Sequence, residues 1–336
     1  MPSNSFAGFA NTSISKLHDY QSKKLRTLAP DATVPKLTSM MNTYKIRTMP
    51  ILEKGVFVGT VTQTDVARHL PPNIKILPFS VLKDKNFNFD ELIEGSQDFK
   101  TKRIKDVFED ILYIKEDEEI AVISSTTSLL NSIKCFVKQG ANNRRYRTLM
   151  IREGNRYDGV LSYLDVFKVI LTHADVLGGL LSQRVGELLS KKEIFISSKI
   201  DCLSDAIYTL DHNLFTHLPI AAAADSKEVI GFINEAIIRS LQYEVIYEHL
   251  EDMELGKILE IQRLSFEDMT VKSTDTVKAA LEKFTQSRTR PQTLLVGEIN
   301  EGSLSVSIEN TLSYVDMMRI IIKFMDGQLD NNLQVI

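Results

Sequence analysis

One pattern of apolar and polar positions occurs twice in this chain, with one hundred residues between the two copies. Residues 59–66 and residues 159–166 each give a glycine turn, a short apolar strand, a hydroxyl residue and an aspartate three positions later. The aspartates, Asp65 and Asp165, each stand where a helix is expected to begin. A repeat identifies the building unit of a fold before any single motif does. The pattern therefore predicts a protein built from copies of one strand–helix unit.

Two weaker copies follow in the second half of the chain. Residues 229–237 keep the glycine but have Asn234 and Ile237 where the hydroxyl and the acid are expected. Residues 305–317 restore both, as Ser313 and Asp316, but lack the glycine. Four units are thus expected, as a stronger pair and a weaker pair.

The periodicity between these blocks predicts the remaining elements. The dipeptide at 178–179, Gly-Gly, is the best candidate for a linker between the two halves. Strands are expected at 49–52, 56–61, 120–123, 194–196, 218–220, 269–271 and 293–296, and helices at 34–44, 65–70, 128–139, 203–212, 235–254, 275–286 and 316–325. Short strands that alternate with helices favour small mixed sheets, an α/β (α+β) class, over one long doubly wound sheet.

Bulk composition narrows the class of protein. A chain of 336 residues suggests two domains, and 43% hydrophobic with 25% charged residues is ordinary for a globular protein. The net charge of −4 argues against a nucleic-acid binder, and no apolar run is long enough to span a membrane. The two cysteines have no CxxC spacing, which favours free thiols in a reducing compartment. We therefore expect a cytoplasmic or nuclear protein.

The hydroxyl–acid spacing allows two interpretations. In a capping box, a hydroxyl and an acid three residues apart bond each other's backbone amides at a helix start. A helix N-terminus also attracts phosphate, and the hydroxyls of Thr62, Thr64 and Ser162 would add hydrogen bonds there. An ionised Asp65 or Asp165 only accepts hydrogen bonds, which suits the paired ribose hydroxyls of a nucleotide. Both interpretations extend to Ser313 and Asp316, whereas Ile237 predicts an empty or altered site.

The four blocks resemble cystathionine-beta-synthase (CBS) domains, small adenosyl-ligand-binding modules that pair into Bateman modules. Four of them without a catalytic domain resemble the gamma subunit of AMP-activated protein kinase. The resemblance implies two Bateman modules, each with a pseudo-twofold axis. The boundaries it implies are an N-terminal tail at 1–22, CBS domains at 23–70, 104–175, 182–243 and 256–326, a connector at 71–103 and a C-terminal tail at 327–336.

The resemblance also implies a set of ligand contacts. Arg47 and Arg147 each lie twelve residues before the glycine of their block. They resemble the basic residues that reach ligand phosphates in the gamma family, and a guanidinium binds phosphate bidentately without losing its proton. The aspartates would hold ribose. The implied ligands are AMP, ADP and ATP, with no cofactor and no metal.

The resulting hypothesis is a non-catalytic, energy-sensing regulatory subunit of a protein kinase. Its implied partners are the kinase catalytic and scaffold subunits, with the first module carrying the nucleotide response and residues beyond 179 supporting assembly. No GxSxG, HExxH, Walker or GxGxxG motif occurs, so an enzyme is not expected. The alternative is a structural adaptor, or a stand-alone CBS protein with degenerate ligand sites that regulates another partner.

Overall fold

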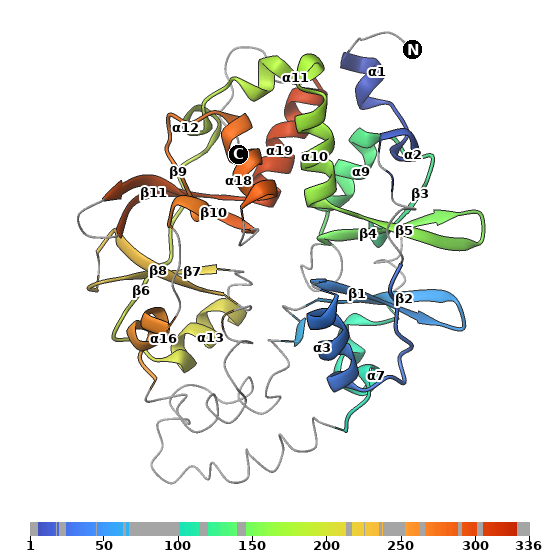
Figure 1. The fold of residues 1–336 in the computed structure, drawn as a ribbon, viewed down its shortest axis with the longest axis horizontal. Coiled ribbons are helices and arrows are strands. Elements are labelled where there is room, and N and C mark those ends of the chain that lie inside the picture. Colours follow the sequence, from blue (N-terminus) through green and yellow to red (C-terminus); the bar gives the residue numbers. More distant parts are fainter. Residues whose placement is uncertain are drawn as a thin grey trace. The chain divides into compact units, whose positions relative to one another are not determined.

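The computed structural model describes most of the chain and divides it into two compact units (Figure 1). Unit 1 comprises Met1–Leu25, Ile114–Ile194 and Ser265–Ile336, and unit 2 comprises Arg26–Tyr113 and Phe195–Leu264. Within them the described residues are 6–17, 19, 25–44, 46–62, 65–66, 101–113, 120–139, 146–212, 217–224, 226–234, 237, 253–261, 266–287, 291–300 and 305–327.

Each predicted repeat contains an antiparallel β-hairpin. The hairpins of repeats one to four are β1 (Thr48–Glu53) with β2 (Val56–Thr62), β4 (Thr148–Glu153) with β5 (Arg156–Ser162), β7 (His217–Ala221) with β8 (Glu228–Asn234), and β10 (Thr293–Asn300) with β11 (Ser305–Ser313). The register shifts at corresponding points, after Ile51, Ile151, Ile220 and Val296. Repeats two and four lie in unit 1, and repeats one and three lie in unit 2.

A short parallel strand precedes the hairpin in repeats two, three and four, and a helix lies between that strand and the hairpin. The strands are β3 (Val122–Ser124), β6 (Ser197–Ser198) and β9 (Thr270–Val271). The helices of repeats one to four are α3 (Val34–Thr43), α9 (Leu129–Val137), α13 (Leu203–His212) and α18 (Val277–Gln286). Thr33, Ser128 and Thr276 cap three of these helices, each accepting from the amide three residues on, which explains where they begin.

The core of unit 1 joins repeats two and four through reciprocal helix contacts. After its hairpin, repeat two forms α10 (Tyr163–Thr172), and repeat four forms α19 (Tyr314–Met325). Helix α10 packs on α18 of repeat four, while α19 packs on α9 of repeat two. The rings of Tyr163 and Tyr314 lie 4.7 Å apart at their centroids, and those of Phe167 and Phe284 lie 5.4 Å apart. All four side chains are buried, so they hold the two repeats together.

Four short helices also pack on the repeats. They are α2 (Ile14–Leu17) on repeat two, α7 (Ile104–Val107) on repeat one, α12 (Val185–Leu188) on repeat four and α16 (Leu255–Ile261) on repeat three. Each begins with a backbone amide bonded to the turn before its repeat's first helix: Ile14 to Thr127, Ile104 to Ala32, Val185 to Asp275 and Leu255 to Asp201, all at 2.8–2.9 Å. These contacts cross the predicted domain boundaries. For example, the sequence assigns residues 104–175 to repeat two, whereas α7 packs on repeat one.

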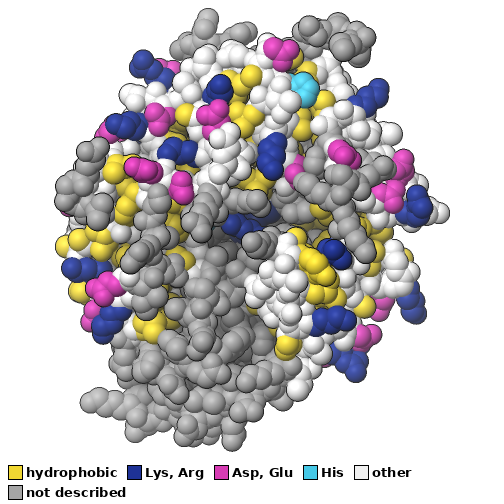
Figure 2. All heavy atoms as spheres, viewed as in Figure 1, with side chains coloured by type: hydrophobic (Ala, Val, Ile, Leu, Met, Phe, Trp, Pro, Cys, Tyr) yellow, Lys and Arg dark blue, Asp and Glu magenta, His cyan; other side chains and the backbone are white. Residues whose placement is uncertain are grey.

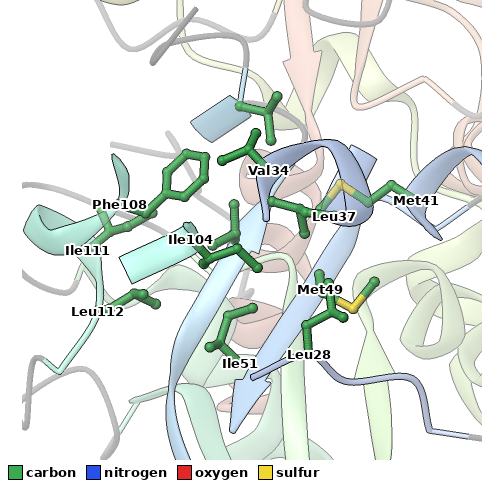
Figure 3. Packing of buried hydrophobic residues seen from close by; sticks show 12 residues of the cluster. Leu28, Val34, Leu37, Met41, Met49, Ile51, Ile104, Phe108, Ile111 and Leu112 are labelled. Carbon is green, nitrogen blue, oxygen red and sulfur yellow. The ribbon is translucent and has the colours of Figure 1, made fainter. Parts of the chain in front are cut away.

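Repeat one shows what such a segment contributes. After α7 a 3₁₀ turn, η1 (Glu109–Ile111), continues the segment. Figure 3 shows Ile104, Phe108 and Leu112 lying beside side chains of α3 and β1, and all belong to one buried cluster. Burying a large apolar side chain is worth about 1.5–3 kcal/mol. The segment therefore completes the core of repeat one.

Several predicted elements are confirmed, and others are corrected. Seven of the eight hairpin strands, the helices at 203–212 and 275–286 and the last helix form near their expected positions, whereas β4 was not predicted. The Gly-Gly dipeptide expected as a linker is helical: it lies inside α11 (Ala174–Leu181), whose Leu177, Leu180 and Leu181 are buried. The strand at 194–196 was also wrong, since β6 starts at Ser197, and residues 120–121 are helical rather than extended.

Some predictions cannot be compared with the structure. Residues 71–100 of the connector predicted at 71–103, the helix after 66 and most of the helix at 235–254 lie outside the described residues. The predicted pairing of repeats adjacent in sequence concerns the relative placement of the two units and stays a prediction. In the part of the chain that the structure describes, no helix has both the length and the apolar character needed to cross a membrane.

Candidate functional site

In each hairpin the first residue of the first strand pairs with the last residue of the second strand, and we call this open end the hairpin edge. Thr48 pairs with Thr62, and Thr148 pairs with Ser162. Arg47 and Arg147 immediately precede these threonines, so each arginine lies next to the hydroxyl residue of its own repeat. The backbone register thus gives Arg47 beside Thr62 and Arg147 beside Ser162 corresponding positions in repeats one and two.

Repeat four has a glutamine at the same place. Thr293 pairs with Ser313, and the amide of Tyr314 donates to the carbonyl of Gln292 at 3.0 Å. In repeat two the amide of Tyr163 donates to the carbonyl of Arg147 in the same way, at 3.2 Å. Gln292 therefore corresponds to Arg147. The sequence hid this match because repeat four differs in the spacing between this residue and its glycine-equivalent position.

The three aspartates all close a capping box. The Oδ2 atom of Asp65 accepts from the amide and the hydroxyl of Thr62, both at 2.7 Å. Asp165 accepts from Ser162 at 2.9 and 2.6 Å, and each aspartate amide donates back to the hydroxyl. Asp316 and Ser313 repeat the geometry at 2.9 and 2.6 Å. The capping interpretation is therefore confirmed at all three.

Capping leaves the carboxylates able to do more. The cap bonds that each carboxylate accepts go to one oxygen, Oδ2. An ionised carboxylate offers about four lone-pair positions. The aspartate residues are only 5–8% exposed. Ser162 and Ser313 stand at the N-termini of α10 and α19, where the helix dipole favours anions. An anionic group and a polyol could both be held there.

Repeat three lacks this chemistry. The side-chain oxygen of Asn234 accepts from the amide of Ile237 at 2.9 Å, so the cap persists with an amide in place of a hydroxyl. Ile237 is buried at 5% exposure and offers no acceptor. Repeat three therefore keeps the helix cap but has no carboxylate, which agrees with the prediction of an altered site.

The glycine of the repeated block has a role that the sequence interpretation missed. Gly59 lies inside β2 with φ 150°, not in a turn. A Cβ atom there would lie 2.8 Å from Cδ2 of Leu112 and 3.1 Å from the carbonyl of Ile111. At Gly231 a Cβ would similarly meet Leu259 of α16, at 2.6 Å. At Gly59 and Gly231 the absence of a Cβ atom lets the following segment pack closely against the strand.

Repeat four also has a cation that sequence reasoning did not find. The ammonium of Lys192 lies 2.5 Å from Oδ2 of Asp316. Lysine 192 follows α12 in a stretch without regular structure, 124 positions before its partner, so no local motif signals the pair. The predicted residue Thr64 lies outside the described residues.

Other candidate chemistry is weak. Burial raises the pKa of the Cys135 and Cys202 thiols, which makes them less reactive at neutral pH, and both are free. Among the described residues no group of His, Cys, Asp and Glu could hold a metal ion. On the visible face of Figure 2, the basic and acidic side chains of the described residues are interspersed.

Comparison with known proteins identifies the repeat and the fold. Residues 17–72 match the CBS domain family model. The chain is 20% identical over 263 residues to uncharacterized protein MJ1225 of Methanocaldococcus jannaschii, across 77% of this chain and 81% of that protein. It is 30% identical over 95 residues to uncharacterized protein MJ0450 of the same organism, across 27% of this chain and 49% of that protein.

Solved structures extend the likeness to nearly the whole chain. The crystal structure of MJ1225, described as a proposed archaeal homolog of g-AMPK, matches with TM-score 0.64 at 17% identity, covering 92% of this chain and 99% of that one. An uncharacterized conserved protein from Pyrococcus horikoshii matches with TM-score 0.53 at 13% identity, over 92% and 99%. The chain thus contains a CBS domain and has a mixed α/β fold shared with an uncharacterized archaeal protein of similar extent.

Proposed function

We propose that this CBS-domain chain is a non-catalytic regulatory protein that binds adenine nucleotides at the hairpin edges of its repeats. AMP, ADP and ATP are the ligands we favour, and the bound state is passed to a protein partner. The observation that carries the proposal is the cluster in repeat two. Ser162 and Asp165 bond each other at the N-terminus of α10, and the Arg147 backbone accepts from the first amide of that helix, so an arginine, a hydroxyl and a carboxylate come from neighbouring positions.

Each group has a distinct task in this proposal. The Arg147 guanidinium and the start of α10 would hold phosphate, since both favour anions. The Asp165 carboxylate would accept from ribose hydroxyls while its Oδ2 atom keeps the cap. Arg47, Thr62 and Asp65 repeat the set in repeat one, and Thr64 adds a hydroxyl to it in the sequence. The chain itself holds the ligand and performs no chemistry on it.

The position of the cluster suggests how occupancy is transmitted. Tyr163 lies between Ser162 and Asp165 in the first turn of α10, and its ring packs on Tyr314 of repeat four. A ligand that shifts this turn therefore acts directly on the contact between two repeats. Nucleotides with different numbers of phosphates would stabilise different arrangements of that contact, which is a population shift.

The proposed partner is a protein kinase of the AMP-activated class with its scaffold subunit. This part rests on the resemblance to gamma subunits and on the likeness to MJ1225, described as a proposed homolog of g-AMPK. The alternative, an adaptor with degenerate sites, is favoured only for repeat three, where Ile237 replaces the acid.

Calorimetric titration of the full chain with AMP, ADP, ATP and S-adenosylmethionine tests the proposal. Saturable binding of one or more adenine nucleotides, with mutual competition, is expected. Binding of S-adenosylmethionine alone would redirect the proposal to another adenosyl ligand. Absence of binding by all four would refute nucleotide sensing and favour the adaptor.

A further inference from the structure

Repeat four departs from repeats one and two at two positions that frame its aspartate. Asn310 stands where the other repeats have Gly59, Gly159 and Gly231, three residues before the capping residue. Gln292 stands where repeats one and two have an arginine. The cap, the hairpin and α19 are intact, so these changes are not a loss of the fold.

The asparagine fixes the segment that follows α12. Its Nδ2 atom donates to the carbonyl of Ser190 at 2.7 Å, and its Oδ1 atom accepts from the amide of Thr311 at 2.8 Å. Asn310 is 8% exposed, so both bonds are largely shielded from water. Ser190 lies two residues before Lys192. The residue that replaces glycine in repeat four therefore holds the backbone that delivers the lysine.

Lys192 pairs with the same aspartate oxygen that accepts the hydrogen bonds of the cap. Oδ2 of Asp316 accepts from the amide of Ser313 at 2.9 Å and from its hydroxyl at 2.6 Å, and the Lys192 ammonium lies 2.5 Å away. The side chains of Lys192 and Asp316 are 33% and 11% exposed, respectively. Partly buried charges are screened less than exposed ones. Because Asn310 anchors the backbone two residues earlier, the main chain of Lys192 is already held near Asp316 when the pair forms.

We propose that Lys192 is a resident counter-ion that keeps the carboxylate of repeat four closed to the sugar of a nucleotide. The proposal deepens the proposed function and rests on it. A ribose diol needs a carboxylate that accepts two hydrogen bonds. In repeat four Oδ2 of Asp316 accepts the two cap bonds and also pairs with Lys192, so the sugar would be left with Oδ1 of a carboxylate whose charge the lysine already balances. Any nucleotide at this edge must displace the lysine and would not meet an arginine at Gln292. Lys192 thus excludes a nucleotide from repeat four.

The central test is calorimetry with AMP on the variant Lys192→Met, which keeps the aliphatic stem and removes the charge. We expect this variant to bind an additional equivalent of AMP relative to the wild type. Lys191→Met is the matched control, since it removes the same charge from the neighbouring exposed residue. It should leave the stoichiometry unchanged. Lys192→Arg should also keep the wild-type stoichiometry, because the pair with Asp316 can re-form.

A second variant identifies the new site. Adding Asp316→Asn to Lys192→Met should return the stoichiometry to the wild-type value, because the acceptor uncovered by the first change is then neutral. Circular dichroism and thermal unfolding would establish that each variant is folded.

The outcomes separate this inference from the proposed function. If the wild type binds AMP and Lys192→Met gains nothing, the resident counter-ion is refuted and nucleotide sensing stands. Weaker or fewer binding events in Lys192→Met would make the lysine a ligand-binding cation and would also overturn the inference. If neither the wild type nor any variant binds a nucleotide, the proposed function fails and the inference fails with it.

Discussion

Repeats two and four of unit 1 are built on one plan and differ at their hairpin edges. Both have a capping box of serine and aspartate, and each packs its last helix on the first helix of the other. The shared features satisfy backbone groups and bury apolar side chains, so folding alone explains them. Arg147 and Gln292 occupy the same edge position, which folding leaves open. The evidence for function therefore lies at the edge and not in the cap.

This comparison changes the meaning of the repeated aspartate. The sequence alone makes Asp65 and Asp165 strong candidates for ligand contacts. Their capping geometry gives them a structural task that Asp316 performs equally. An aspartate variant will thus affect stability whether or not a nucleotide binds, and the arginines become the sharper probes.

Breaking the shared interface should have the largest effect. Phe284 of repeat four is fully buried and packs on Phe167 of repeat two. Phe284→Ala should lower the free energy of unfolding by about 3–5 kcal/mol, because it leaves a cavity in the core. Urea denaturation measures this. Glu187→Ala, on the exposed side of α12, is the control and should change stability by less than about 0.5 kcal/mol. Similar values for both variants would mean that the two repeats do not share a core.

The glycine position sharpens the comparison at the next level. Repeat four tolerates Asn310 there, whereas a Cβ at Gly59 would lie 2.8 Å from Leu112 and would need a φ of 150°. Gly59→Ala should cost about 1–3 kcal/mol through overpacking against the segment after α7. Chemical denaturation of this variant should show the loss. An unchanged stability would indicate that the segment does not pack on β2 in solution.

The capping boxes should respond alike in the two repeats. Asp165→Ala and Asp316→Ala should each lower the free energy of unfolding by about 0.5–2 kcal/mol, the usual range for a lost cap. Asp165→Asn and Asp316→Asn keep an acceptor for the serine amide and should cost less. Thermal unfolding without ligand compares the four variants. If only one of the two alanine variants lost stability, the two caps would have the same geometry but different contributions to the free energy of unfolding.

The smallest effect should come from the glycine pair after repeat two. A Cβ at Gly178 would meet nothing within 4 Å, and the residue lies inside α11. Gly178→Ala should raise stability by about 0.4–1 kcal/mol, because alanine loses less backbone freedom on folding. A decrease in melting temperature would restore the linker interpretation.

The sequence predicted the elements whose signals are local. Apolar patterning located most hairpin strands and the helices α3, α9 and α18, which begin at caps that act within three residues. The two-residue strand β6 is too short to leave a period, and the apolar stretch before it imitated a strand. Gly-Gly suggested a linker, but the leucines around it decided the helix through burial.

The candidate site divides in the same way. Arg147 and Asp165 could be predicted because one repeat contains both, and β-register brings them together. Lys192 could not, since its partner comes from a repeat more than a hundred residues later and the contact depends on Asn310 holding Ser190. Helices α7 and α12 were missed for a related reason. Each of these helices has four residues, far fewer than an average helix. So short a segment has no apolar periodicity in its sequence, and its packing on a distant repeat leaves no local signal.

The most direct test of nucleotide binding at the hairpin edges is the AMP affinity of the double variant Arg47→Gln/Arg147→Gln. This change gives repeats one and two the edge residue of repeat four and leaves the aspartate caps in place. The loss of hydrogen bonds to a charged donor, worth about 1.5–3 kcal/mol, predicts an affinity lower by about ten- to a hundredfold. Lys54→Gln/Arg156→Gln, at the far turns of the same two hairpins, removes the same charge and should bind AMP like the wild type. Equal affinities for the two double variants would contradict the account.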